Sequence, residues 1–121
     1  MTDSAYATGQ VVEPSGWINL PDIAEQLDIP VTRVHQLIRE RSLLAVRRDG
    51  VLRVPAELMA TPAARKHLPG VLTLLHDAGY NDEEALRWLY TVDESLPGTP
   101  AAALSADRAT EVKRRAQALG F

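Results

Sequence analysis

The sequence predicts a mainly α-helical fold with one small β-hairpin, and three observations support this prediction. Apolar residues recur at helical spacing in two short segments, 20–27 and 31–38, on either side of Asp28-Ile29-Pro30. Asp49-Gly50 stands between two β-prone runs, which is a strong signal of a hairpin turn. The second half of the chain carries helix-capping and helix-ending residues at short intervals. We therefore expect a helical pair, a hairpin and a C-terminal helical region.

Length and composition narrow the class of protein. The chain has 121 residues, of which 45% are apolar, and no cysteine, so it can bury a core but can form neither disulfides nor thiolate metal sites. No apolar run approaches the roughly 18 to 20 residues that span a bilayer. The first residues lack the basic start and apolar stretch of a secretory signal. We expect a cytoplasmic protein that does not interact with a membrane.

The helical pair has the features of a helix-turn-helix. Asn19 is the expected N-cap of the first helix, with Pro21 in its first turn. Ala24 is small enough to let two helices cross closely. Asp28 occupies the turn position that often needs a positive φ, and Pro30 ends the first helix and presets the second. In such a motif the second helix enters the DNA major groove.

The second helix would then expose side chains suited to DNA. Thr32, Arg33 and Gln36 lie toward its N-terminal half, which meets base edges, while His35 and Arg39 are candidates for backbone contacts. Glutamine can pair with adenine, and arginine with guanine or phosphate. The alternative is that these are ordinary polar positions on a small bundle. The side turned inward would consist of Val31, Val34, Leu37 and Ile38.

A hairpin directly after the second helix would be a wing. Its expected strands are 44–47 and 51–54, with a helical turn over 56–59 after Pro55. A lone two-stranded hairpin is marginally stable, so we expect it to pack on the helices. Its arginines and one at the end of the second helix would reach flanking phosphates or the minor groove: Arg41, Arg47, Arg48 and Arg53.

The distribution of charge favours a nucleic-acid partner, although the net charge of -3 opposes it. Between residues 31 and 54, all six basic residues are arginines, and only Glu40 and Asp49 oppose them. Guanidinium groups suit bidentate contacts to phosphate or guanine. The acidic residues gather elsewhere, notably at 82–84 and 93–94. The alternative is that the arginines form an ordinary solvated face.

The regions flanking the expected DNA-binding domain, residues 17–59, differ from each other. Residues 1–16 are small, polar and aperiodic, which predicts a disordered tail. A phosphate in this tail would oppose DNA binding through its negative charge. Residues 60–121 are expected to form a helical region packed on or beside the domain. The hydroxyls available for phosphorylation in the tail are Thr2, Ser4 and Thr8.

Capping residues divide the C-terminal region. We expect a short turn at 63–67 and a separate helix over 69–78 that Gly79 ends. Asn81 and Glu84 resemble a capping box for the next helix. The last two helices would begin at the caps Thr99 and Ser105. Three basic residues of the final helix are either a second DNA contact or solvated partners of its C-terminus: Lys113, Arg114 and Arg115.

Residues 18–59 resemble the winged helix-turn-helix of excisionase-type and MerR-like DNA-binding domains. The second half, in residues 111–121 and in the segment LPGVLTLLHDAGYNDEEALRWLYTVDESL, resembles a family of small actinobacterial DNA-binding proteins. These proteins join a winged helix-turn-helix to a helical C-terminal region, and one member is a Ser/Thr protein kinase substrate. The resemblance implies DNA binding controlled by phosphorylation of the N-terminal tail, with a kinase as a partner.

The expected function is that of a double-stranded DNA-binding transcriptional regulator without cofactor, metal or catalytic activity. His35, His67 and His76 fall in different predicted elements without metal-binding spacing, and no glycine-rich phosphate loop is present. Tight binding would require a homodimer or a second DNA-contacting surface. One alternative is an antitoxin-like or adaptor protein whose C-terminal region binds a protein. Another is a winged helix that binds protein only.

Overall fold

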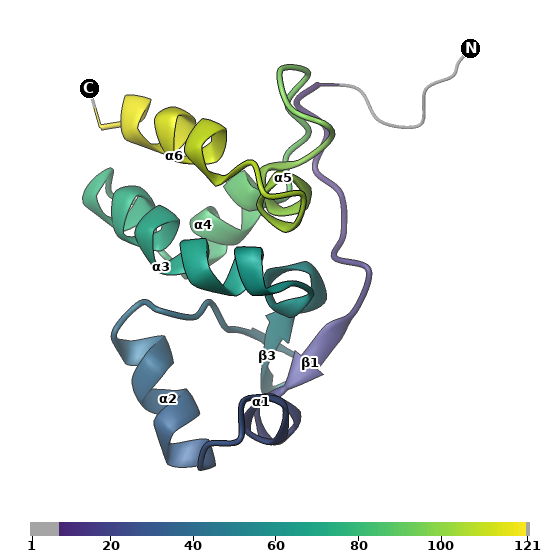
Figure 1. Ribbon diagram of the computed structural model, residues 1–121, viewed down its shortest axis with the longest axis vertical. Coiled ribbons are helices and arrows are strands. Elements are labelled where there is room, and N and C mark those ends of the chain that lie inside the picture. The colour runs from purple at the N-terminus through teal and green to yellow at the C-terminus, as the bar shows by residue number, and fades with distance from the viewer. Residues whose placement is uncertain (1–7, 121) are drawn as a thin grey trace.

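The computed structural model describes residues 8–120 and is mainly helical, with a small antiparallel sheet (Figure 1). Thr2 and Ser4 lie outside the described residues. The N-terminal half consists of β1 (Trp17–Asn19), α1 (Leu20–Leu27), α2 (Val31–Arg39), β2 (Val46–Arg48), β3 (Val51–Pro55) and the 3-10 turn η1 (Ala56–Met59). The C-terminal half consists of α3 (Pro62–Asp77), α4 (Asp82–Leu89), α5 (Pro100–Ser105) and α6 (Ala109–Ala118). This confirms the predicted winged helix-turn-helix followed by helices.

The turn between α1 and α2 forms as the sequence predicts. Asp28 adopts a left-handed conformation with φ of 55°, and Pro30 stands directly before α2. Val34 is fully buried at the centre of the motif. Two local predictions are wrong in part. Asn19 is the N-cap of α1 as predicted, but its side chain makes none of the expected capping bonds; Val31 is 40% exposed because it occupies the first turn of α2.

The wing belongs to a three-stranded sheet with the order β1-β3-β2. Asp49 and Gly50 both have positive φ, 55° and 78°, as a type I′ turn requires. Strand β1, which was not expected from the sequence, pairs with β3 so that Ile18 lies opposite Val54. This third strand gives the hairpin the support that an isolated pair of strands lacks.

Helix α3 is continuous across Pro69, so the predicted break before this residue is wrong. Proline removes one backbone donor and usually ends or kinks a helix. Here Leu68 and Val71 on either side of it are almost fully buried, and their packing keeps both parts of the helix in place. As a result His67 and His76 share one helix rather than lying in separate elements.

The later helices follow most of their predicted signals. Asn81 and Glu84 form both bonds of a capping box, and the Thr99 hydroxyl accepts from the backbone of α5. The last helix, however, does not begin after Ser105. Asp107 has a φ of 61°, which interrupts the chain before α6, and the Ser105 hydroxyl donates instead to the carbonyl oxygen of Glu57, 3.1 Å away.

Residues 8–16 are ordered against the C-terminal half, so the expectation of a disordered tail is wrong for them. The amide of Gly9 donates to the Val92 carbonyl at 2.8 Å, and the amide of Val12 donates to the Tyr90 carbonyl at 2.9 Å. Val11 and Thr91 form an isolated antiparallel bridge. This segment therefore runs like an added strand beside the loop that follows α4.

One hydrophobic core connects the two halves. It includes Ile23 and Val34 from the helix-turn-helix, Leu58 from η1, and Leu75 and Leu104 from α3 and α5, all with essentially no exposed surface. Figure 1 shows α3, α5 and α6 stacked above α1 and α2. Within the described range, no helix is both long enough and apolar enough to cross a bilayer.

Candidate nucleic-acid interface

The outer side of α2 presents all five of its candidate DNA-binding residues to solvent. They come from one helix of nine residues, whose buried side packs through Val34 on α1. α2 lies at the edge of the molecule, so this side faces outward (Figure 1). The exposed residues are Thr32, Arg33, His35, Gln36 and Arg39.

The carboxylate of Glu40, directly after α2, contacts two of these side chains. The Gln36 amide donates to its carboxylate at 2.9 Å, and the Arg33 guanidinium lies 3.5 Å from it. The Arg33 and Glu40 side chains are 43% and 48% exposed. An ion pair at such exposure contributes only about 0 to 1 kcal/mol, so both groups can exchange Glu40 for another ligand at little cost.

Arg39 and Arg41 are cations without a counter-charge. Both are exposed, and within residues 8–120 no carboxylate oxygen lies within 4 Å of either guanidinium. Arg41 has a φ of 58°, which turns the chain away from α2 directly after the helix. The C-terminal end of α2 therefore offers two positive charges that can bind an anion without first breaking an ion pair.

The wing arginines differ from one another. Arg47 is exposed, and its guanidinium makes one bond, to the Gly50 carbonyl at 3.3 Å. Arg48 instead donates two hydrogen bonds to Glu83 of α4, at 2.9 and 3.1 Å, and lies 5.2 Å above the Trp17 ring. The Glu83 hydrogen bonds raise the pKa of Arg48, and the same contact lowers the pKa of Glu83. Arg48 thus ties the wing to the C-terminal half.

The guanidinium of Arg53 also has a carboxylate partner. Its guanidinium lies 3.6 Å from the Asp49 carboxylate at the tip of the wing, and its side chain is 28% exposed. The Arg53 Nε is buried without a hydrogen-bond partner in the described part of the chain, which is costly for a charged donor. Of the three wing arginines, Arg47 is the one that can reach an external anion without losing a carboxylate.

Glu57 forms a polar junction that was not expected from the sequence. Its carboxylate accepts from the Tyr90 hydroxyl at 2.7 Å and from the Ser15 amide at 3.0 Å. Burial raises the pKa of Glu57, but the bonds from Ser15 and Tyr90 outweigh burial and leave that pKa below its ordinary value. Burial and the neighbouring carboxylate raise the pKa of Tyr90. The junction links the end of the wing, the N-terminal segment and α4, and no local sequence signal announces it.

The histidines do not converge on a site. His35 is exposed on α2, and His67 contacts the ammonium of Lys113, which lies 3.1 Å from its Nδ1. His76 is exposed further along α3. In residues 8–120, no group of three or more histidine, aspartate or glutamate side chains is placed to hold a metal ion.

Both halves of the chain match models of the same protein family. A family model described as "DNA-binding protein Rv2175c, wHTH domain" matches residues 7–59, and one described as "Rv2175c C-terminal domain of unknown function" matches residues 66–120. The "DNA-binding protein Rv2175c" of Mycobacterium tuberculosis is 44% identical over 117 residues, covering 85% of this chain and 80% of that protein. The solved "NMR structure of Rv2175c" matches with a TM-score of 0.79 and 39% identity, over 98% of this chain and 91% of that one.

Proposed function

Because the chain belongs to the Rv2175c family, we propose that it binds double-stranded DNA as a transcriptional regulator, with α2 as recognition helix and the β2–β3 hairpin as wing. The observation that carries this proposal is the exposed polar side of α2. It presents hydrogen-bonding groups at the N-terminal end of the helix and unpaired cations at the other end. That order suits a helix whose first turns meet base edges.

Two side chains of α2 are proposed to read bases. The Gln36 amide can bond to adenine in a bidentate manner, and the Arg33 guanidinium can bond to guanine. Thr32 lies beside Arg33 in the first turn and can contact either base. His35 is placed for backbone contacts. Because Gln36 and Arg33 are exposed and share Glu40 as a weak partner, DNA would replace that partner.

The phosphate contacts are proposed for Arg39, Arg41 and Arg47, which have no carboxylate partner in the described chain. Such contacts fix the position of the protein on the duplex without reading sequence. Arg48 and Arg53 also lie in the wing, but their guanidinium groups are bound to Glu83 and Asp49.

A salt titration tests the function. Kd for a random duplex of roughly 30 base pairs is measured by fluorescence anisotropy from 50 to 200 mM salt. Each phosphate contact adds about 0.9 to the magnitude of the slope of log K against log salt, so these three arginines alone contribute about -3 to it. Gln36→Ala is expected to leave this slope unchanged and to relax the base preference found by selection from a random pool. Absence of binding at 50 mM salt would favour a protein-binding role instead.

Control by a Ser/Thr kinase is the second part of the proposal. Thr8 is the one described residue among the three candidate hydroxyls, and it is exposed. A phosphate there would add about -1.5 to -2 charge and repel a duplex. The affinity of the kinase-treated chain is compared with that of Thr8→Ala treated in the same way. If both lose affinity equally, Thr8 is not the regulatory site.

A further inference from the structure

A recognition helix and one wing make few contacts, yet the C-terminal half offers further cations. Three basic residues form what we call the α3–α6 cationic surface: Lys66 of α3, and Lys113 and Arg114 of α6, with His67 beside Lys113. We propose that this surface binds the sugar–phosphate backbone of duplex DNA outside the segment read by α2. The inference rests on the proposed function and extends it to a second point of contact.

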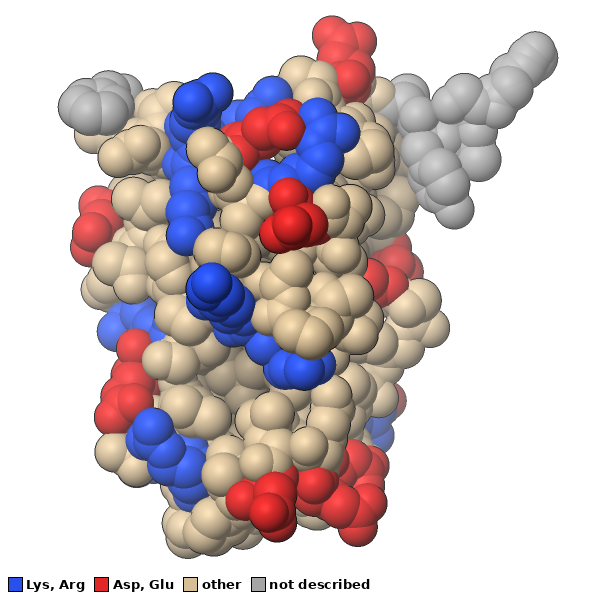
Figure 2. All heavy atoms as spheres, viewed as in Figure 1, with Lys and Arg blue, Asp and Glu red and all other residues tan. Residues whose placement is uncertain are grey.

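The two helices bring these residues together through a close approach. The Lys113 Nζ lies 3.1 Å from the His67 Nδ1. The Lys113 chain crosses Gly70, where an added Cβ would lie 3.1 Å from Lys113 Cε. Lys66 precedes Gly70 by four residues and shares its side of α3. Figure 2 shows basic side chains following α6 and α3 on one face of the molecule.

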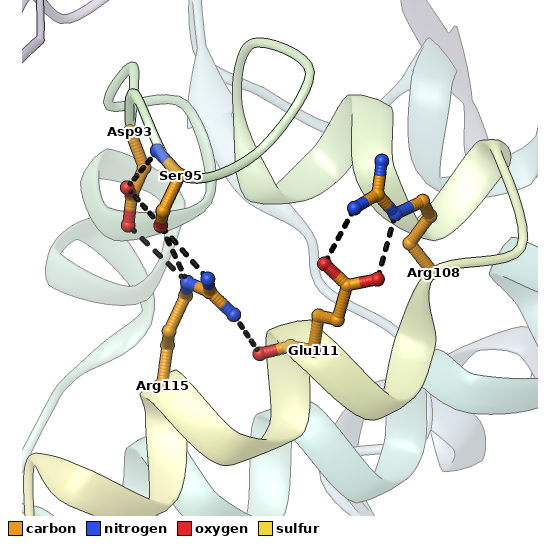
Figure 3. Close-up of polar contacts among 5 residues, drawn as sticks. All are labelled: Asp93, Ser95, Arg108, Glu111 and Arg115. Atoms are coloured by element: carbon orange, nitrogen blue, oxygen red, sulfur yellow. Dashed lines mark hydrogen bonds and ion pairs between the residues drawn. The ribbon is translucent and has the colours of Figure 1, made fainter.

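Two other cations of the same helical region are paired with carboxylates, which distinguishes them from this surface. Arg108 binds Glu111 at 2.6 Å, and the Arg115 Nε lies 3.6 Å from Asp93 and 3.0 Å from the Ser95 hydroxyl (Figure 3). In contrast, no carboxylate of residues 8–120 lies within 4 Å of the charged groups of Lys66, Lys113 or Arg114. Three cations that make no ion pair, on two helices packed against each other, favour a polyanion, because their neutralisation releases condensed counterions.

The neighbours of these cations favour a phosphate backbone over a protein partner. Protein–protein interfaces have an apolar centre within a polar rim. Among the exposed positions of the same two helices, Gly70, Thr73 and Gln117 carry no apolar side chain that could form such a centre. Backbone recognition requires only basic and hydrogen-bonding groups, and this surface supplies both.

The test compares two charge-matched double variants of the full chain. Lys113→Gln with Arg114→Gln removes two unpaired charges, whereas Arg108→Gln with Arg115→Gln removes two paired charges from the same helical region. The slope of log K against log salt is measured on the same random duplex. The first variant is expected to reduce the magnitude of the slope by about 2 and the affinity at 0.1 M salt by about tenfold per contact, while the second leaves the slope unchanged.

Equal changes in both variants would show a general charge effect and overturn the proposal, and so would no change in the first. A third variant, Arg39→Gln with Arg41→Gln, separates this failure from failure of the proposed function. If it alone weakens binding, α2 binds DNA and the α3–α6 cationic surface does not. If the unmodified chain does not bind the duplex, the proposed function itself is overturned. Circular dichroism melts confirm that each variant is folded.

Discussion

The end of α2 and the wing carry the same type of side chain in opposite electrostatic settings. Arg39 and Arg41 at the end of α2 are exposed and unpaired within the described chain. Arg48 and Arg53 of the wing are bound to Glu83 and Asp49. The comparison shows that the number of arginines in a segment differs from the number of charges available to a ligand. The six arginines of residues 31–54 therefore do not act as one uniform surface.

The contacts of the wing explain this difference. A short hairpin needs support from other elements, and here β1 and α4 provide it. The bidentate bond of Arg48 to Glu83 and the bond of Tyr90 to Glu57 both connect the wing region to the C-terminal half. Contacts with other elements thus hold the wing in place and leave Arg47 exposed, whereas the polar side of α2 stays exposed along the helix.

The largest effect is expected from removing the two positive charges at the C-terminal end of α2. Arg39→Gln with Arg41→Gln should weaken binding to a random duplex at 0.1 M salt by about tenfold for each phosphate interaction that the substitutions remove. Arg48→Gln with Arg53→Gln removes the same charge but should weaken binding by less than about threefold, because two hydrogen bonds to Glu83 and the Trp17 ring hold Arg48, and the Arg53 side chain is only 28% exposed. Anisotropy titrations of both variants on one duplex measure the difference. Equal decreases in affinity would contradict the distinction between free and bound arginines.

A smaller effect, on stability, is expected when the bracing contact at Glu57 is removed. Tyr90→Phe should lower the free energy of unfolding by about 1 to 2 kcal/mol at pH 7, since it removes a hydrogen bond to a carboxylate. Because the folded-state pKa of Glu57 is lowered, its contribution is fully present above the unfolded pKa of about 4.3 and disappears as the pH falls through the folded value.

Urea unfolding at pH 7 and at roughly pH 3 measures this pH dependence. The difference between the original chain and Tyr90→Phe should therefore shrink in acid. Tyr80→Phe is the matched control, because Tyr80 is half-buried and its hydroxyl makes no hydrogen bond within the described residues. A difference that is the same at both pH values would mean that packing, not the Glu57 carboxylate, makes Tyr90 important.

The features predicted from sequence are those determined by neighbouring residues. Asp28, the Asp49-Gly50 turn and the Asn81 capping box all adopt their predicted geometry, because a few adjacent backbone angles or bonds decide each of them. The exposed polar side of α2 follows in the same way from the 3.6-residue period. These signals are enough to predict a winged helix-turn-helix and to select its outward residues.

The missed features depend on residues far apart in the chain. Arg48 and Glu83 are separated by 35 positions, and Glu57 and Tyr90 by 33, so no local pattern reveals either contact. The N-terminal segment is ordered by backbone bonds to residues 90–92, although its own composition predicts disorder. Packing on both sides of Pro69 overrides the usual effect of proline. In each case tertiary contacts decide the outcome over local propensity.

The smallest effect is expected when a wing arginine loses its carboxylate partner and becomes available to DNA. Glu83→Gln should raise affinity for a random duplex by roughly twofold to fivefold, because Arg48 becomes available to a phosphate and a nearby negative charge is removed. The cost in stability should stay below about 1 kcal/mol, since the Glu83 side chain is 60% exposed. Asp82→Asn removes one charge from the same turn of α4, and Asp82 forms no ion pair with an arginine in the described chain. If Asp82→Asn increases affinity as much as Glu83→Gln does, the gain comes from the loss of one negative charge and not from the release of Arg48. Arg48 would then be a brace of the wing whether or not Glu83 is charged.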